Sequence, residues 1–398
     1  MRQNGDKRDR VQSKKILIVS STTQTLYNFR IGLLRALRDN KFDVRAIAKR
    51  EEFDKKLEEE GFKCIFLQYL DRKGVNPIED IKLMLELRRI YREEKPDLII
   101  HYTIKPNIYG SIVSRFTGTT SFCMITGLGY AFTKKGVLLK VVKLLYKISL
   151  GFTKKIFFQN DDDRKLFIEE GIAPSDKSVL LSGGVDTEYF SPEVCRNLNK
   201  KNSNNLSFLL IARMLWDKGI GEFVKAAGIV KKRFPDTEFQ LLGFIDKGNP
   251  SVIPEDKIKD WEREGLIKHL GSTDDVRPFI CKSSCVVLPS YREGIPHSLL
   301  EAMAMAKPII TTDSAGCKEV VENGKNGFLV PVKDAEALAS AIVRFINLSE
   351  VRKIKMGEYS REKAIKEFDE KPIIKICLKH IEDALRNTKF KNISGVKR

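Results

Sequence analysis

The sequence lacks any long hydrophobic run. Its first 14 residues are polar, and no stretch reaches the ~20 consecutive apolar residues that a membrane-spanning helix needs. Hydrophobic sequence begins only at Ile16, as a short run, so no signal-peptide core precedes it. We therefore expect a cytoplasmic chain without a membrane span, with loose tails at 1–14 and at the basic residues 387–398.

Cysteine is scarce and offers no pairing pattern. Cys281 and Cys285 lie one helical turn apart, but no second Cys/His pair supports a metal site there. An odd, scattered set favours reduced thiols over a disulfide framework. We expect core thiols and no metal. The seven positions are Cys64, Cys123, Cys195, Cys281, Cys285, Cys317 and Cys377.

Basic residues exceed acidic residues by 71 to 53, which gives a formal net charge of +18. Such an excess attracts nucleic acid, anionic lipid or phosphorylated substrates. A nucleic-acid-binding protein should show base-stacking aromatics among its Lys and Arg residues, or a known binding module. Neither is present, so nucleic acid is not an expected partner.

Short apolar strands alternate with helical stretches in two series, which predicts parallel sheets covered by helices on both faces. A chain of 398 residues also exceeds what one core usually supports. The expected fold class is α/β, with two doubly wound, Rossmann-like domains facing a central cleft. Strands are expected at 15–20, 43–48, 63–67 and 97–101, then at 206–211, 238–243, 268–271, 285–289, 308–312 and 327–330. The expected limits are a first domain at 15–190, a linker at 191–205, a second domain at 206–370 and a C-terminal helix at 371–386 that returns to the first domain.

One candidate site follows the first strand of the second series, in the segment Ile211-Ala-Arg213-Met-Leu-Trp-Asp-Lys218-Gly219. Arg213 and Lys218 lie in the loop before a helix, where an anion would meet both cations and the helix N-terminus. A solvated Arg/Lys pair at a loop edge explains the same residues equally well.

The second candidate site joins a strand, a loop and a helix start, in the segment E-GIPHSLL-E from Glu293 to Glu301. Backbone N–H groups near His297 can hold a phosphate. Glu301 lies one turn into the helix and can face a diol, and Glu293 precedes the turn, near a sugar on that phosphate.

In these motifs the chain resembles glycosyltransferase family 4, whose members have the GT-B fold and carry two Glu residues separated by seven others. The similarity extends from Ile16 to about Leu385. Supporting segments are Asn28-Phe-Arg30, Gly183-Gly-Val-Asp186, Leu270-Gly-Ser272, Gly316-Cys-Lys-Glu319 and Asn323-Gly-Lys-Asn-Gly327.

The resemblance implies a retaining glycosyltransferase that uses a nucleotide sugar, with no metal and no other cofactor. Glu293, Arg213 and Lys218 would be the catalytic set: the two cations hold the diphosphate, and Glu293 holds the sugar. Glu301 would bind the ribose hydroxyls. The other implied donor-binding residues are Gly243, Ser272, Gly294, Ile295, Ser298 and Leu299. The implied acceptor-binding residues, in the first domain, are Phe29, Arg30, Lys105, Thr126 and Gly127.

Four features depart from the family pattern or invite another interpretation. The loop Ser20–Thr25 has no glycine, and Thr126 takes a position where many relatives have His. His101 is interpreted as a structural histidine. Asp161-Asp-Asp163 could suggest a metal-binding pair, but carboxylates at a helix start more simply cap it.

The segment 134–155 contains seven lysines and no acidic residue. Lys140, Lys143 and Lys147 share one helical stripe, which favours docking on an anionic membrane; snorkelling lysines on an internal helix are the alternative. We therefore expect peripheral association with the inner face of the plasma membrane, which favours a lipid-linked acceptor over a soluble one.

Within the family the chain looks most like bacterial enzymes that extend saccharides on undecaprenyl diphosphate, N-acetylgalactosaminyltransferases in particular. The similar segments are Thr103–Asn107, Gly127–Gly129 and Ala212–Trp216. A UDP-N-acetylhexosamine donor is expected. The alternatives are UDP-hexose or GDP-mannose, a soluble acceptor, or a non-catalytic basic binding protein.

Overall fold

The computed structural model describes residues 13–51, 53–71, 76–129, 132, 136–196 and 205–394, with side chains to residue 386. Contacts divide the chain into two units. Unit 1 comprises residues 1–124, 148–155 and 378–398, and unit 2 comprises residues 125–147 and 156–377. The limits expected from chain order were 15–190 and 206–370. They differ because spatial contacts group residues 156–190 with unit 2.

Unit 1 contains parallel strands in the order β3-β2-β1-β4-β5. Strand β1 is buried from Ile16 onward and runs directly into α1, whose cap is Thr22 accepting a hydrogen bond from the Thr25 backbone N–H. The loop without glycine is thus a direct strand-to-helix junction. The elements are β1 (Lys15–Thr22), α1 (Thr23–Asp39), β2 (Asp43–Lys49), α2 (Asp54–Glu59), β3 (Lys63–Leu67), α3 (Pro77–Glu94), β4 (Leu98–Tyr102), the π-helical turn η1 (Pro106–Gly110), α4 (Ser111–Thr117) and β5 (Thr120–Ile125).

Unit 2 contains parallel strands in the order β10-β9-β8-β11-β12-β13. Its core is aromatic: Phe208 stacks on Phe239, and Phe345 from α12 meets Phe208 edge-on. The elements are β8 (Ser207–Ile211), the turn η4 (Trp216–Lys218), α8 (Ile220–Lys231), β9 (Glu238–Leu242), α9 (Glu255–Arg263), β10 (Lys268–His269), α10 (Arg277–Lys282), β11 (Cys285–Leu288), α11 (His297–Ala304), β12 (Ile309–Thr312), the turn η5 (Lys318–Val320), β13 (Gly327–Val330), α12 (Ala335–Ile346) and α13 (Glu350–Glu367).

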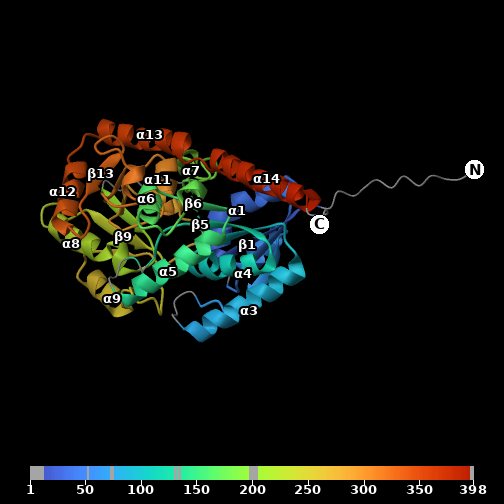
Figure 1. Ribbon diagram of the computed structural model, residues 1–398. Coiled ribbons are helices and arrows are strands. Elements are labelled where there is room, and N and C mark those ends of the chain that lie inside the picture. The colour runs from blue at the N-terminus through green and yellow to red at the C-terminus, as the bar shows by residue number, and fades with distance from the viewer. Residues whose placement is uncertain are drawn as a thin grey trace, which may run out of the picture. The chain divides into compact units, whose positions relative to one another are not determined.

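The strand order of unit 2 reverses between β8 and β11. Chain order proceeds outward from β8 to β9 and β10 on one side, and from β11 to β12 and β13 on the other. Ligands of doubly wound folds bind at this reversal, outside the carboxyl ends of the strands. The two loops predicted to form a site, after β8 and after β11, flank this point. Helices α8 and α12 pack together beside the sheet (Figure 1).

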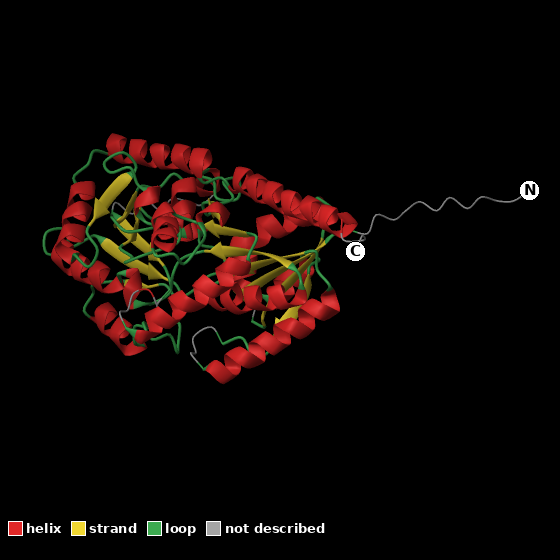
Figure 2. Ribbon diagram, in the orientation of Figure 1, coloured by secondary structure: helices red, strands yellow, loops and turns green. Residues whose placement is uncertain are grey.

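The remaining elements are β6 (Lys155–Phe158), which pairs with β7 (Ser178–Leu180), and several helices that lie, in chain order, between the strands described above or after the last of them. These are α5 (Val137–Phe152), α6 (Asp161–Glu169), the turn η3 (Ser175–Lys177), α7 (Glu193–Arg196) and α14 (Glu370–Ser394). The strands, yellow in Figure 2, lie between red helices, as the α/β prediction requires. No helix in the described part of the chain combines the length and apolarity needed to cross a membrane.

Two sequence predictions were wrong. The end of the chain was expected to be loose from residue 387, but α14 continues to Ser394. The cysteines were expected to be reduced, but Cys195 on α7 and Cys281 on α10 form a disulfide. The two cysteines are 86 positions apart in sequence, but their Cα atoms lie 5.2 Å apart in the structure. The prediction of a buried thiol holds for Cys285.

Candidate active site

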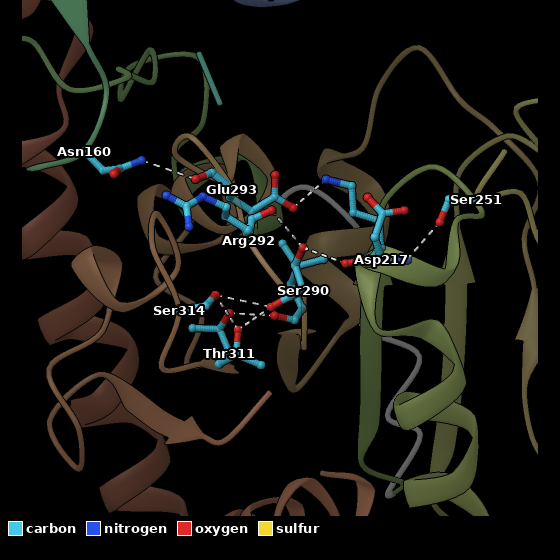
Figure 3. A network of polar contacts seen from close by, with 11 residues as sticks. Asn160, Asp217, Ser251, Ser290, Arg292, Glu293, Thr311 and Ser314 are labelled. Carbon is cyan, nitrogen blue, oxygen red and sulfur yellow. Dashed lines mark hydrogen bonds and ion pairs between the residues drawn. The ribbon is translucent and has the colours of Figure 1, made fainter. Parts of the chain in front are cut away.

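The loops after β8 and β11 are fastened to each other at the reversal point. Gly219 has φ +72°, and a Cβ atom there would lie 2.0 Å from the Pro289 carbonyl oxygen, so only glycine fits. The Tyr291 N–H donates to the Asp217 carbonyl over 3.0 Å, and the Ser290 hydroxyl donates to the same oxygen over 3.1 Å (Figure 3). This close approach brings Lys218, the residue after Asp217, beside the motif that begins at Glu293.

Lys218 and Glu293 contact each other directly. Lys218 Nζ lies 2.5 Å from Glu293 Oε1, and the two side chains are 16% and 14% exposed. Partial burial strengthens the attraction relative to a surface ion pair, because solvent screens it less. The structure therefore joins the two predicted site loops through an ion pair of their predicted functional residues.

Arg213 is held by a residue that the sequence analysis missed. Its Nη1 donates to Asp246 Oδ2 over 2.6 Å. Asp246 follows β9 and is only 4% exposed, whereas Arg213 is 37% exposed. A buried carboxylate thus orients the guanidinium at the strand ends and leaves much of it open to an anion.

Gly243 and Ser272 lie at the ends of β9 and β10. Gly243 has φ +146°, and a Cβ atom there would lie 1.9 Å from the Ala212 carbonyl oxygen. The Gly243 N–H donates to the Gly271 carbonyl over 2.7 Å. Ser272, the next residue, is exposed. Backbone packing therefore brings three loops together at this edge and leaves Ser272 at its rim.

The start of α11 carries the rest of the second motif. Pro296, which precedes the helix, makes no side-chain capping bond, and its carbonyl accepts the Leu299 N–H over 3.0 Å. Ile295 and Leu299 are buried in the core, so only their backbones can meet a ligand, whereas Ser298 is partly exposed.

Glu301 lies on α11, and the residue as a whole is partly exposed. Burial raises its pKa to about 8. Hydrogen-bond donors from a ligand would stabilise the ionised form, because they replace the lost solvation. This position suits the contact with ligand hydroxyls that the motif predicted.

The segment Glu293–Gly294 is enclosed by backbone on two sides. A Cβ atom at Gly294 would lie 2.3 Å from the Thr126 carbonyl oxygen, and one at Gly316, where φ is +82°, would lie 2.4 Å from the Glu293 carbonyl oxygen. Gly127 has φ +121° and approaches the Gly294 nitrogen. Thr126 and Gly127, predicted on the acceptor side, therefore lie against the donor motif.

The other predicted acceptor residues lie in unit 1. Phe29 on α1 is 38% exposed. The Arg30 guanidinium lies 4.8 Å from the centre of the Tyr102 ring. Lys105 is paired with Asp80 at 2.6 Å and is only 13% exposed. Its charge is thus already compensated, and this pairing with a residue of α3 was not predicted from the sequence.

His101 is a structural histidine, as predicted. It is fully buried, and its Nε2 lies 2.9 Å from the Tyr91 hydroxyl. Burial lowers its pKa to about 3, so the ring is neutral at physiological pH.

The three aspartates begin α6, as predicted, but the cap is the preceding residue. Asn160 accepts a hydrogen bond from the Asp163 backbone N–H. Asp162 pairs with Lys318 at 2.7 Å, and the buried carboxylate of Asp163 pairs with Arg292. The sequence pattern located this helix start but not its contacts with the Glu293 loop.

Helix α5 exposes apolar residues together with two of its predicted lysines. Lys140 and Lys147 are exposed, but Lys143 is paired with Glu170 at 2.5 Å, so the three do not act alike. The apolar residues of this face, 40–77% exposed, are Val137, Leu138, Val141, Leu144, Ile148 and Phe152.

Two family models match the chain. A family model described as "Glycosyl transferase 4-like" matches residues 15–160, and one described as "Glycosyl transferases group 1" matches residues 205–347. Both halves of the chain thus match glycosyltransferase families.

Similar proteins act on lipid-linked saccharides. A Campylobacter jejuni N,N'-diacetylbacillosaminyl-diphospho-undecaprenol alpha-1,3-N-acetylgalactosaminyltransferase is 28% identical over 94% of this chain and 100% of that protein. An Escherichia coli UDP-Gal:alpha-D-GlcNAc-diphosphoundecaprenol alpha-1,3-galactosyltransferase is 27% identical over 77% of this chain and 81% of that protein. The crystal structure of Anabaena HepE with UDP and glucose has the same fold: its TM-score is 0.77 at 19% identity, over 93% of this chain and 99% of that one.

Proposed function

We propose that this chain, a glycosyltransferase whose first half matches a 4-like family model and whose second half matches a group 1 model, moves a sugar from a UDP-sugar to a saccharide on undecaprenyl diphosphate. The pathway would be the synthesis of a bacterial surface polysaccharide or glycan. N-acetylhexosamine is the proposed sugar, because a relative that matches 94% of the chain is an N-acetylgalactosaminyltransferase.

The observation that carries this proposal is the contact of Lys218 with Glu293 at the reversal point of the unit 2 sheet. A diphosphate that approaches Lys218 would place its attached sugar near Glu293. Glu301 lies about one turn into α11, in the same motif, and is available for the ribose hydroxyls. UDP as the nucleotide is supported by HepE, whose structure contains UDP in the same fold.

Catalysis would depend on stabilising the departing diphosphate. Negative charge develops on the leaving oxygen as the sugar–oxygen bond breaks, and fixed cations at that point lower the barrier. Arg213, oriented by Asp246, and Lys218, oriented by Glu293, are such cations. Retention of anomeric configuration, with the leaving phosphate accepting the acceptor's proton on the same face, is proposed from the family resemblance. We propose that no metal takes part, which a transfer assay in EDTA tests directly.

We further propose that the protein docks on the membrane surface, where it would reach a lipid-linked acceptor. Helix α5 exposes Val141 and Leu144 between the exposed residues Lys140 and Lys147. Apolar residues flanked by lysines suit the interface of an anionic bilayer, where the lipid-linked acceptor lies.

The test is a donor screen with purified full-length protein and an undecaprenyl-diphosphate-linked saccharide. Labelled UDP-GalNAc, UDP-GlcNAc, UDP-galactose, UDP-glucose and GDP-mannose would each be offered, and label in the lipid fraction measured. Transfer from a UDP-N-acetylhexosamine supports the full proposal. Transfer only from UDP-galactose would favour the alternative that the E. coli relative suggests. No transfer from any donor, with either lipid-linked or soluble saccharides, would refute it.

A further inference from the structure

Asn160 occupies the junction between β6 and α6 and is 1% exposed. Its side-chain oxygen accepts the Asp163 backbone N–H over 2.8 Å, which caps the helix. That bond uses only the acceptor half of the amide. The donor half, the amide nitrogen, is left to bond other acceptors.

The amide nitrogen of Asn160 donates to the loop that carries Glu293. It lies 2.8 Å from the Gly294 carbonyl oxygen and 3.3 Å from the Glu293 carbonyl oxygen, and also 3.2 Å from Asp163 Oδ2. Figure 3 shows Asn160 facing Glu293 across this contact. Residues 133 and 134 positions apart in sequence are thus joined by one side chain.

We propose that Asn160 is a positioning residue of the transferase, which ties the Glu293–Gly294 backbone to the start of α6 and so fixes the Glu293 carboxylate toward Lys218. The inference rests on the proposed function, because it assigns Asn160 a role in placing a donor-binding group. Asn160 itself contacts no predicted substrate group.

A second link between the same two segments supports this role. Arg292, one residue before Glu293, pairs with Asp163, three residues after Asn160. Asp163 is 1% exposed, so this ion pair lies at the base of the loop. The Arg292 side chain is anchored on α6 and the Glu293 side chain on Lys218, so the intervening backbone is fixed from both sides.

The chemistry of the amide explains why this position holds Asn. A carboxamide can accept from a helix N–H and donate to carbonyl oxygens at the same time. Asp offers no donor, and its charge would face two carbonyl oxygens and Asp163. Ser can cap the helix but is too short to span the distance to the loop. Small displacements of a positioning group lower rates strongly, by on the order of 10²-fold for about 1 Å.

The test compares Asn160→Ser with wild type in the full-length protein. Serine keeps the cap of α6 and removes the bond to the Glu293 loop. We expect kcat/KM for sugar transfer to fall by roughly 10- to 100-fold, while the Kd for UDP alone changes less than about twofold. Asn160→Asp should lose at least as much activity. The matched control is Asn76→Ser, which makes the same change at the exposed cap of α3, where Asn76 accepts from the Ile78 N–H.

A purely capping role gives the opposite result: Asn160→Ser would keep kcat/KM within about twofold of wild type, and the inference would be overturned. Hydrogen–deuterium exchange provides a readout independent of activity. In Asn160→Ser, amide protection in residues 291–296 should fall while that in α6 stays unchanged. Unchanged protection of the loop also overturns the inference. Failure of wild type to transfer any sugar, with loop protection lost in the variant, would refute the proposed function and leave the positioning contact established.

Discussion

Lys218 Nζ lies 2.5 Å from Glu293 Oε1, so the cation expected on the diphosphate and the carboxylate expected on the sugar form one ion pair. A donor bound at this edge would meet both groups in fixed positions. Preorganised charges of this kind need no reorientation as the reaction proceeds, which is the source of their catalytic effect. Under the proposed function, Glu293 would therefore have two tasks, to hold the lysine and to contact the sugar.

Replacing Lys218 with Ala should lower kcat by about 10²- to 10³-fold, because it removes a cation from the leaving diphosphate. The melting temperature should also fall, because the change leaves the mostly buried Glu293 carboxylate unpaired, so kcat is compared at a temperature where both proteins are folded. The control is Lys225→Ala, which removes an exposed lysine from α8. Near-normal turnover of Lys218→Ala would refute the donor-site assignment.

Glu301 should make stability fall as pH rises. Burial raises its pKa from 4.5 to about 8, so the folded protein keeps a proton that the unfolded chain releases. This contribution is full below pH 4.5 and is lost as pH approaches 8. Between pH 5 and 8, wild type should lose at least about 1 kcal/mol relative to Glu301→Gln, roughly 2–4 °C in Tm. Parallel Tm profiles for the two proteins would contradict the raised pKa.

Gly294→Ala should destabilise the protein and impair transfer, because the added Cβ would lie 2.3 Å from the Thr126 carbonyl oxygen. We expect a loss of about 1–3 kcal/mol in chemical denaturation. Gly228→Ala on α8 is the opposite case, since its Cβ would meet only Leu266 at 3.5 Å. It should stabilise the helix by about 0.5–1 kcal/mol. Equal effects of the two changes would mean that the Gly294 contact is not a constraint.

Reversing the charge of Lys140 and Lys147 together should weaken binding to anionic vesicles by at least roughly 30-fold, at about 1 kcal/mol for each lysine lost. Lys143 is left in place because it pairs with Glu170. Vesicle cosedimentation measures the effect. The control double change, Lys355→Glu with Lys366→Glu, alters the same charge on the exposed side of α13. Unchanged partitioning of the α5 variant would favour snorkelling lysines without docking.

Local signals predicted most of the fold and the motifs. Apolar runs bounded by polar turns identified β3 and β13 with their observed ends, and Gly61 ended a helix where φ is +84°. The Arg213 and Glu293 loops were located because each follows a strand and precedes a helix. These features depend on neighbours within a few residues.

Distant partners could not be predicted. Asp246 lies 33 residues from Arg213, and Asn160 lies 134 residues from Gly294. Neither contact has a local pattern, since each depends on which strands become neighbours in a sheet. The same holds for Lys105. Its ion-pair partner Asp80 lies on α3, and strand β4 separates the two in sequence. Sequence alone thus located the charged groups but not what orients them.

The bond between Cys195 and Cys281 closes a ring of chain around the first half of the unit 2 sheet, with β8, β9 and β10 inside it. A protease that cuts once anywhere in that ring leaves both fragments covalently attached. On a denaturing gel the nicked protein would then migrate near full length until a reductant is added, when two bands separate. Electrophoresis with and without reductant therefore reports whether this pair is oxidised in a given preparation.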